Sequence, residues 1–203
     1  AIEQSLRTLR LEDRATLVRC KRNLGYAGSQ KLAYRLVRER CQNGAVVMLH
    51  ADGQYPPEFV PTMFELLENG ADVVYGVRSR RRFGEMEETP LKVRAAMSVL
   101  NVLESFLTGC SSIKEWHSGY VGYRAGFLRR LNLQAVTDTK HFDGNMLFAA
   151  HSLGASISSL PIYKRYKKYD GFVGPEAYLY IWHCLVLMGQ MPESRARLGA
   201  VEQ

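Results

Sequence analysis

The sequence predicts an α/β protein, in which helices cover a β-sheet. Apolar patterns with the period of a helix alternate along the chain with short apolar runs that indicate strands. One run, Val46 to Leu49, leads directly into the polar residues Asp52 and Gln54. Polar residues at the end of a strand are typical of the ligand-binding edge of an α/β sheet. The 203 residues, 46% of them hydrophobic, suffice for one ordinary domain with its own core.

Each element follows from its local pattern. Helices are predicted over residues 2–11, 26–41, 58–68, 91–107, 124–131, 144–153 and 175–191, and strands over 15–20, 46–49, 71–77, 157–162 and within 113–123. Pro57 suits the first turn of the helix at 58–68, and Gly70 follows its end. Residues 79–90 have no apolar period and are predicted to form a loop, and the polar tail after residue 191 is expected to fray.

The chain carries an excess of positive charge. Its 27 Lys and Arg exceed its 20 Asp and Glu by seven, and the excess gathers at residues 78–82 and 164–168, among other places. Such a surface suits nucleic acid, anionic lipid headgroups or phosphate-bearing substrates. Because no signature of nucleic-acid binding accompanies the charge, we expect no nucleic-acid partner. The sequence indicates no specific protein partner.

The cysteines are scattered and include no C-x-x-C pair. Neither His183 with Cys184 nor His141 with His151 has the spacing of metal ligands. We therefore expect free thiols in a cytoplasmic protein and no structural zinc. Residues 178–188 are the most apolar segment, but they fall short of the roughly 18 to 20 residues that span a bilayer. They could form a core helix or a helix that lies on a membrane surface.

Asp52 and Gln54 are the candidate metal ligands. Residues two apart in an extended chain point the same way, so both oxygens could reach one hard cation such as Mg²⁺ or Mn²⁺. Such an ion keeps several waters and takes other ligands from a substrate's phosphates. The alternative is a surface turn in which Asp52 caps the following helix.

Short motifs occur along the chain in a fixed order. They are Asn23-Leu24-Gly25-Tyr26-Ala27-Gly28, His50-Ala51-Asp52-Gly53-Gln54-Tyr55, Asp72 to Arg78, Glu115-Trp116-His117-Ser118-Gly119-Tyr120, Phe142-Asp143, Gly154 to Ile162, and Tyr163-Lys164-Arg165-Tyr166. This order resembles that of the family-2 inverting glycosyltransferases of GT-A fold, in the branch of dolichyl- and polyprenyl-phosphate sugar synthases. The resemblance runs from about residue 5 to about residue 170.

The resemblance implies a fold and an activity. The fold is a Rossmann-like, mostly parallel sheet flanked by helices over residues 1–174, followed by a C-terminal helix and polar tail over 175–203. The activity is transfer of a hexose from a nucleotide-sugar donor, with inversion and a divalent Mg²⁺ or Mn²⁺, to an acceptor such as a polyprenyl or dolichyl phosphate. A lipid acceptor implies peripheral contact with the cytoplasmic face of a membrane.

Roles carry over residue by residue. Asp52 matches the catalytic metal-binding acid at the donor diphosphate, and Gln54 matches a further contact of that metal site. Glu115 matches an acid near the acceptor and is the candidate catalytic base. On the acceptor side it is accompanied by His117 and Ser118. The positions that match contacts to the donor or its phosphates are Asn23, Gly25, Arg78, Arg165 and Lys168.

The chain departs from the family pattern at several points. His50 replaces a first aspartate, and Val121 stands where an arginine is common. The chain also begins after the family's opening strand, so the sheet is expected to be N-terminally incomplete. Two other functions therefore stay open: a non-catalytic fragment or pseudoenzyme of the same fold, and a basic module that binds anionic surfaces. Binding by such a module would fall steeply with salt and ignore Mn²⁺.

Overall fold

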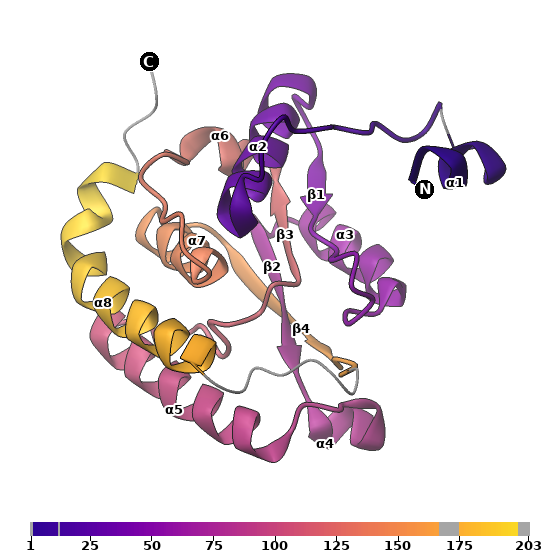
Figure 1. Ribbon diagram of the computed structural model, residues 1–203. Helices are drawn as coiled ribbons and strands as arrows, with labels where there is room; N and C mark the ends of the chain where they lie inside the picture. The colour runs from indigo at the N-terminus through magenta and orange to yellow at the C-terminus, as the bar shows by residue number, and fades with distance from the viewer. Residues whose placement is uncertain (1, 12, 167–174, 199–203) are drawn as a thin grey trace.

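The computed structural model describes residues 2–11, 13–166 and 175–198 and shows a central sheet flanked by helices (Figure 1). The helices are α1 (Ile2–Thr8), α2 (Gly25–Arg40), α3 (Val60–Glu68), α4 (Arg80–Phe83), α5 (Leu91–Thr108), α6 (Ala125–Arg130), α7 (Phe142–Ser152) and α8 (Pro175–Leu198), with 3-10 turns at Pro57–Phe59 and Gly84–Met86. The strands are β1 (Ala45–Val47), β2 (Val73–Arg78), β3 (Val121–Arg124) and β4 (Ile157–Ile162).

The sheet has the strand order β1-β3-β2-β4 within the described residues. β2 and β4 pair in parallel, whereas β3 is antiparallel to both β1 and β2. The α/β class is confirmed, but the sheet is mixed rather than mostly parallel. The reason lies in the loop before β3, where Glu115 accepts hydrogen bonds from Arg78 at the end of β2. The chain enters β3 from that end and must run back against its neighbours.

Alternate residues of the central strands pack on opposite faces, as the two-residue period of a strand requires. Val73 and Tyr75 of β2 belong to the larger core, which α2, α6 and α7 cover. Val74 belongs to the smaller core on the other face, together with Met63 and Leu67 of α3. The carboxyl ends of β1, β2 and β4 therefore open at one edge, between these two helical layers.

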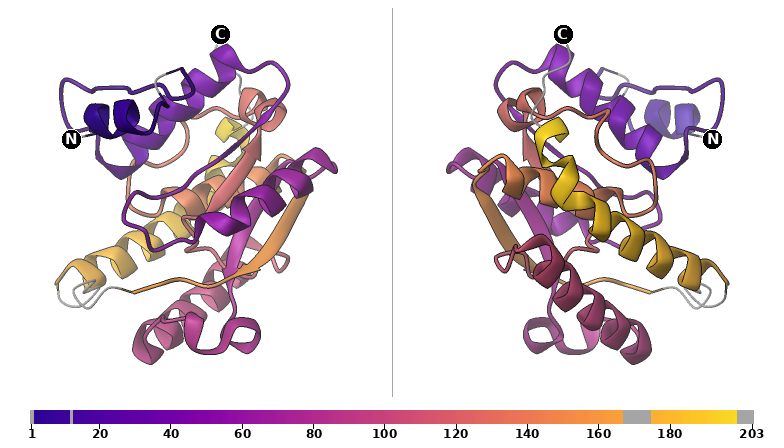
Figure 2. Two further views of the ribbon diagram at one scale, coloured as in Figure 1. Left: turned by 90° about the vertical axis from the view of Figure 1, so that its right-hand side faces the viewer. Right: turned by 90° about the vertical axis from the view of Figure 1, so that its left-hand side faces the viewer.

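Helices α5 and α8 lie side by side and α8 also packs on α7 (Figures 1 and 2). The tail predicted to fray is helical as far as Leu198, which is buried and whose carbonyl accepts the Asn132 N–H at 2.9 Å. This packing extends the helix beyond its predicted end at residue 191. The polar composition of the tail gave no sign of it. No helix in the described part of the chain combines the length and apolar character that crossing a bilayer requires.

Two predicted elements differ in the structure. Residues 15–20 form no strand and are exposed, because they have no partner strand among the described residues. The predicted loop at 79–90 contains α4 and a 3-10 turn. Hydrogen bonds also attach this segment to Lys164, just after β4. The buried Glu87 side chain accepts the backbone N–H of Lys164 at 2.7 Å, and the Glu88 N–H donates to the Lys164 carbonyl at 3.0 Å.

Candidate active site

Asp52 lies in a tight turn just after β1. Its Oδ1 accepts the backbone N–H of Gln54 at 2.9 Å, and Gly53 between them has φ of +70°, a conformation that glycine adopts without strain. The Asp52 side chain remains 46% exposed. The Gln54 carbonyl accepts the backbone N–H of Arg165 at 3.0 Å. The two predicted metal-site residues are therefore held beside the basic segment that follows β4.

His50 sits between two tyrosine rings. It packs edge-on against Tyr26 and Tyr55, with ring centroids 5.6 and 5.4 Å away, and its Nε2 lies 3.2 Å from the Tyr26 hydroxyl. Burial lowers the pKa of His50, and this outweighs the opposing effect of Asp52, whose Oδ2 lies 4.0 Å from the ring. The imidazole that replaces the family's first aspartate is therefore neutral at neutral pH.

Gly119 makes this arrangement possible. A Cβ at residue 119 would lie 2.8 Å from Cε1 of His50 and 2.9 Å from the Tyr26 hydroxyl, closer than van der Waals contact allows. Any side chain at this position would push the two rings apart. The backbone N–H of Gly119 also donates to the Tyr55 hydroxyl at 3.2 Å.

Tyr26 also donates a hydrogen bond to Asp143 at the start of α7. Burial raises the pKa of Asp143 to about 6, although the Tyr26 hydrogen bond opposes this rise. Asp143 was not among the predicted site residues. It lies 117 residues from Tyr26 in the sequence, and only the Phe142-Asp143 motif hinted at it.

These residues line one cavity of about 150 Å³. Its walls include Tyr26, His50, Tyr55, His117, Asp143 and Lys164. The Lys164 ammonium lies 4.9 Å from the centre of the Tyr55 ring, a cation–π contact that holds a positive charge at the cavity. The cavity therefore lies between the segments that follow β1 and β4 and the start of α7.

Asn23 and Gly25, which were predicted to contact the donor, form the turn that opens α2. The Asn23 side chain accepts the Gly25 N–H at 2.8 Å, and Gly25 has φ of +71°. The next residue, Tyr26, reaches the cavity, so this turn lies close to it. Arg165 donates to the Tyr163 hydroxyl at 3.2 Å. Lys168 lies outside the described residues.

Arg78 and Glu115 form a buried ion pair. Nε and Nη2 of Arg78 donate to Oε1 of Glu115, the former at 2.7 Å, and the Arg78 backbone N–H donates to Oε2 at 3.0 Å. Burial alone would lower the pKa of Arg78, but the Glu115 carboxylate outweighs it and raises the pKa above its ordinary value. The predicted phosphate contact and the predicted base thus engage each other.

Of the two residues predicted on the acceptor side, Ser118 is buried and His117, backbone included, is half-buried. The Ser118 hydroxyl accepts the Tyr120 N–H at 3.4 Å. The His117 side chain is 3% exposed and lines the cavity on one side, while its Nδ1 lies 2.7 Å from the Tyr180 hydroxyl of α8. His117 therefore connects the cavity to the C-terminal helix.

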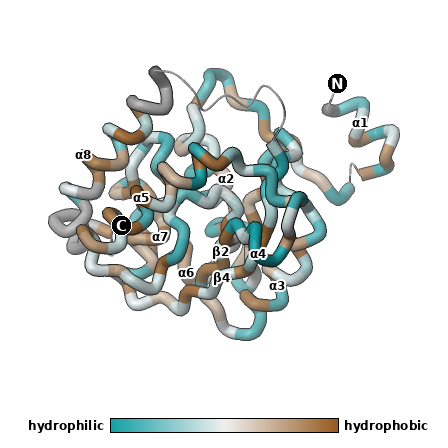
Figure 3. The backbone as a smooth tube through the Cα atoms, turned by 90° about the horizontal axis from the view of Figure 1, so that it is seen from below, coloured by the Kyte–Doolittle hydropathy of each residue, from teal (hydrophilic) through white to brown (hydrophobic). Residues whose placement is uncertain are grey.

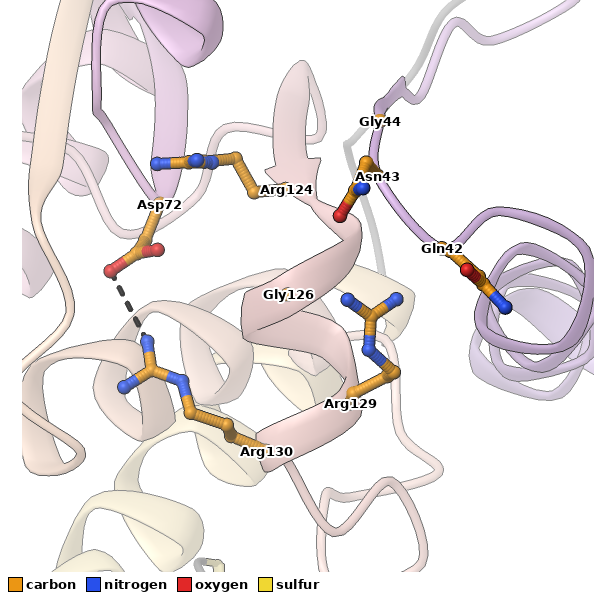
Figure 4. Close-up of a pocket in the computed structure, with 8 residues that line it drawn as sticks. All are labelled: Gln42, Asn43, Gly44, Asp72, Arg124, Gly126, Arg129 and Arg130. Atoms are coloured by element: carbon orange, nitrogen blue, oxygen red, sulfur yellow. Dashed lines mark hydrogen bonds and ion pairs between the residues drawn. The ribbon is translucent and has the colours of Figure 1, made fainter.

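A larger cavity, of about 390 Å³, lies at the opposite end of the sheet and is lined by Arg124, Arg129 and Arg130 (Figure 4). Asp72, just before β2, forms an ion pair with Arg130, with 3.2 Å between Oδ2 and Nη2. Arg129 donates a hydrogen bond to the Cys41 carbonyl at 2.9 Å. These contacts join secondary-structure elements to one another. The cavity is remote from the carboxyl ends of the parallel strands, so we do not assign the reaction to it.

Comparison with known proteins adds independent findings. Residues 1–133 match the model of the family described as Glycosyl transferase family 2. Over 55 residues the chain is 44% identical to an undecaprenyl-phosphate 4-deoxy-4-formamido-L-arabinose transferase of Pseudomonas syringae pv. syringae (strain B728a), covering 27% of this chain and 16% of that protein. Over 118 residues it is 27% identical to the polyprenol monophosphomannose synthase of Mycolicibacterium smegmatis (strain ATCC 700084 / mc(2)155), covering 58% and 44%.

A third relative is an uncharacterized glycosyltransferase, YkcC, of Bacillus subtilis (strain 168). It is 32% identical over 72 residues, which cover 36% of this chain and 21% of that protein. The matched stretches thus span less than half the length of each of these curated relatives.

Proposed function

The chain belongs to glycosyl transferase family 2, and we propose that it moves a hexose from a nucleotide-sugar donor to a polyprenyl or dolichyl phosphate, with inversion. The observation that carries the proposal is the turn at Asp52. The exposed Asp52 carboxylate, in the turn after β1, accepts the backbone N–H of Gln54. The Gln54 carbonyl in turn accepts the backbone N–H of Arg165. The proposed metal-binding acid thus lies beside a basic segment, and a nucleotide diphosphate needs both kinds of group.

The residues present fit a divalent cation. Asp52 offers a carboxylate, the ligand that Mg²⁺ and Mn²⁺ prefer, and Gln54 stands two residues further along. His50 is neutral, because burial lowers its pKa, and so does not repel a cation. Asp52 would hold the ion, with Gln54 beside it. When bound, such an ion offsets the charge that develops on the leaving diphosphate.

The phosphate acceptor is favoured by the state of Glu115. A hydroxyl acceptor needs a general base to remove its proton, whereas a phosphate oxygen is already anionic. The carboxylate of Glu115 is engaged by Arg78 through both of its oxygens. It is therefore poorly placed to accept a proton, and Lys164 at the cavity supplies the positive charge that an anionic acceptor needs.

Exposed apolar side chains on α5 and α8, two helices that pack together, support a lipid-linked acceptor and peripheral contact with the cytoplasmic face of a membrane. Tyr180 of α8 lines the cavity, while Trp182 on the same helix is 62% exposed and Phe106 on the neighbouring α5 is 81% exposed. We call the exposed apolar side chains of α5 and α8 the apolar face: Leu91, Val99, Val102, Leu103, Phe106, Leu107, Leu179, Trp182, Leu185 and Val186. Apolar stretches of α8 are visible in Figure 3. Such a face, on a protein of net charge +7, suits an anionic bilayer surface.

Transfer into lipid is the test of this function. The protein is incubated with Mn²⁺, radiolabelled nucleotide sugars and vesicles that contain a polyprenyl phosphate, and the organic phase is then counted. Label should enter the lipid phase with at least one donor and should not do so with vesicles that lack the polyprenyl phosphate. Transfer to a water-soluble hydroxyl acceptor instead would contradict the proposed acceptor. A donor that binds but is never transferred would favour the non-catalytic alternative.

A further inference from the structure

A second cluster of chemically active side chains lies behind the cavity wall. It consists of Glu104 from α5, His117 from the loop before β3, His141 just before α7, and Cys184 from α8. One ligand atom from each residue lies within 4.8 Å of all the others. Glu104, His141 and Cys184 are completely buried, and the His117 side chain is 3% exposed. We call these four residues the buried cluster.

The histidine nitrogens of the buried cluster lie close to the Glu104 oxygens but make no well-aligned hydrogen bonds with them. His141 Nε2 lies 2.7 Å from Oε1 of Glu104, and His117 Nε2 lies 3.1 Å from Oε2. At these distances hydrogen bonds are expected, yet none of these four atoms makes one of acceptable angle with any described residue. The ring nitrogens and the carboxylate oxygens therefore lie close together without well-aligned hydrogen bonds, an arrangement that also suits atoms around a shared metal ion.

The distances suit a common metal centre. Bonds of about 2.0–2.3 Å from Zn²⁺ to nitrogen, oxygen and sulfur place tetrahedral ligand atoms about 3.3–3.8 Å apart. The ligand atoms of the buried cluster lie at most 4.8 Å apart, so the longest separations must shorten by about 1 Å and the two short nitrogen–oxygen distances must widen slightly to reach this range. Two imidazoles, a thiol and a carboxylate form a borderline-soft set that favours Zn²⁺ over Mg²⁺.

The surroundings hold the two histidines in place. The Tyr180 hydroxyl lies 2.7 Å from Nδ1 of His117, so this contact occupies one ring nitrogen and leaves Nε2 toward Glu104. Such outer contacts commonly fix the ring of a metal-binding histidine. Gly144 leaves room for the other ring, since a Cβ there would lie 2.6 Å from Nε2 of His141.

We propose that Glu104, His117, His141 and Cys184 form a structural Zn²⁺ site that fixes α8 to α5 and to the start of α7. Cys184 binds as a thiolate, and its proton passes to solvent when the ion enters. Four protein ligands leave no open position, which is typical of structural rather than catalytic zinc. The site shares no residue with Asp52 and Gln54, whose oxygen ligands suit a different ion. Because His117 and His141 also line the cavity, the zinc site would stabilise one of its walls.

The alternative is a buried ionic cluster without metal, in which Glu104 pairs with histidines that carry protons. Metal titration of the whole protein separates the two. The purified protein is stripped with a chelator and titrated with Co²⁺, which gives a thiolate charge-transfer band and intense visible bands in a tetrahedral site. We expect saturation at about one ion per chain, and displacement of Co²⁺ by Zn²⁺ but not by Mg²⁺.

Matched variants identify the ligands. Cys184→Ser should abolish the charge-transfer band and weaken Zn²⁺ binding at least ~100-fold, whereas Cys110→Ser, at an equally buried cysteine outside the buried cluster, should keep both. His141→Gln should weaken binding, and His151→Gln should not. If Cys184→Ser does not fold, the Co²⁺ spectrum of the unmodified protein still decides. Absence of that spectrum, with an unfolding temperature that neither chelator nor Zn²⁺ changes, would overturn the zinc site in favour of the ionic cluster. No nucleotide sugar is used, so the outcome is independent of the proposed function.

Discussion

Arg78 and Glu115, which come from the end of β2 and from the loop before β3, form one buried ion pair with three hydrogen bonds between them. From the sequence, Arg78 was expected to contact the donor phosphates and Glu115 to act near the acceptor. The structure instead makes them partners, and each fixes the position of the other. Their ion pair also explains how β3 enters the sheet from the end at which β2 leaves it.

Breaking this ion pair should destabilise the protein strongly. Glu115→Ala leaves the Arg78 guanidinium, 12% exposed, without a counter-charge, and a buried pair broken on one side costs about 3–5 kcal/mol. Urea unfolding of the variant measures this loss. Arg19→Ala, which breaks the exposed pair of Arg19 with Glu3, should cost less than about 1 kcal/mol. Equal costs for the two variants would show that Arg78 and Glu115 are effectively solvated.

Gly119→Ala should weaken donor binding by separating His50 from Tyr26. The added methyl group would lie within 3 Å of both side chains, and such overpacking typically costs about 1–3 kcal/mol. Gly126→Ala is the control, because a Cβ there would lie 4.0 Å from Nη2 of Arg129, an ordinary van der Waals distance. Fluorescence titration with a nucleotide sugar and Mn²⁺ compares the two. Unchanged affinity in Gly119→Ala would remove the His50–Tyr26 pair from the donor site.

Much of this fold is predictable from local patterns, whereas the site is only partly so. The strand at 157–162 and the helix at 91–107 appear nearly as predicted, because the strand pairs with β2 along its whole length and Gly109 ends the helix in a left-handed conformation. Residues 15–20 are also partly apolar, but they have no partner strand among the described residues. Asp52 could be found from the end of its strand.

Long-range contacts explain what local patterns missed. Tyr26 and Asp143 meet only because α2 and α7 cover the same face of the sheet. The buried cluster draws its members from four segments between positions 104 and 184, so no motif spacing reveals it.

Tyr26→Phe should destabilise the protein at neutral pH. Above its pKa of about 6, Asp143 is charged and buried, and the Tyr26 hydroxyl is the donor that supports it. Leaving a buried acceptor without its donor costs about 1–3 kcal/mol. Thermal unfolding at pH 7.5 measures the loss. Tyr166→Phe is the control, because Tyr166 is not among the residues that line this cavity. If Tyr26→Phe behaves like this control, the Tyr26 hydrogen bond does not support the Asp143 carboxylate.

Phe106→Glu should reduce binding to anionic vesicles without affecting the fold. The Phe106 side chain is 81% exposed, so the change removes apolar surface only from the apolar face. Leu9→Glu adds the same charge at an exposed apolar residue outside that face, and it controls for simple repulsion from the lipid. Co-sedimentation with vesicles should show a larger loss for Phe106→Glu. Equal losses would indicate binding through net charge alone.

The central claim is that Asp52 binds a divalent ion together with a nucleotide-sugar diphosphate, and calorimetry tests it most directly. A panel of nucleotide sugars is titrated into the unmodified protein, Asp52→Asn and Glu68→Gln, each with and without Mn²⁺. Glu68 is an exposed carboxylate at the end of α3 and controls for loss of one negative charge. We expect Mn²⁺-dependent binding of at least one donor by the unmodified protein and by Glu68→Gln, and loss of this binding in a folded Asp52→Asn. Donor binding that persists unchanged with Mn²⁺ in Asp52→Asn would contradict the central claim.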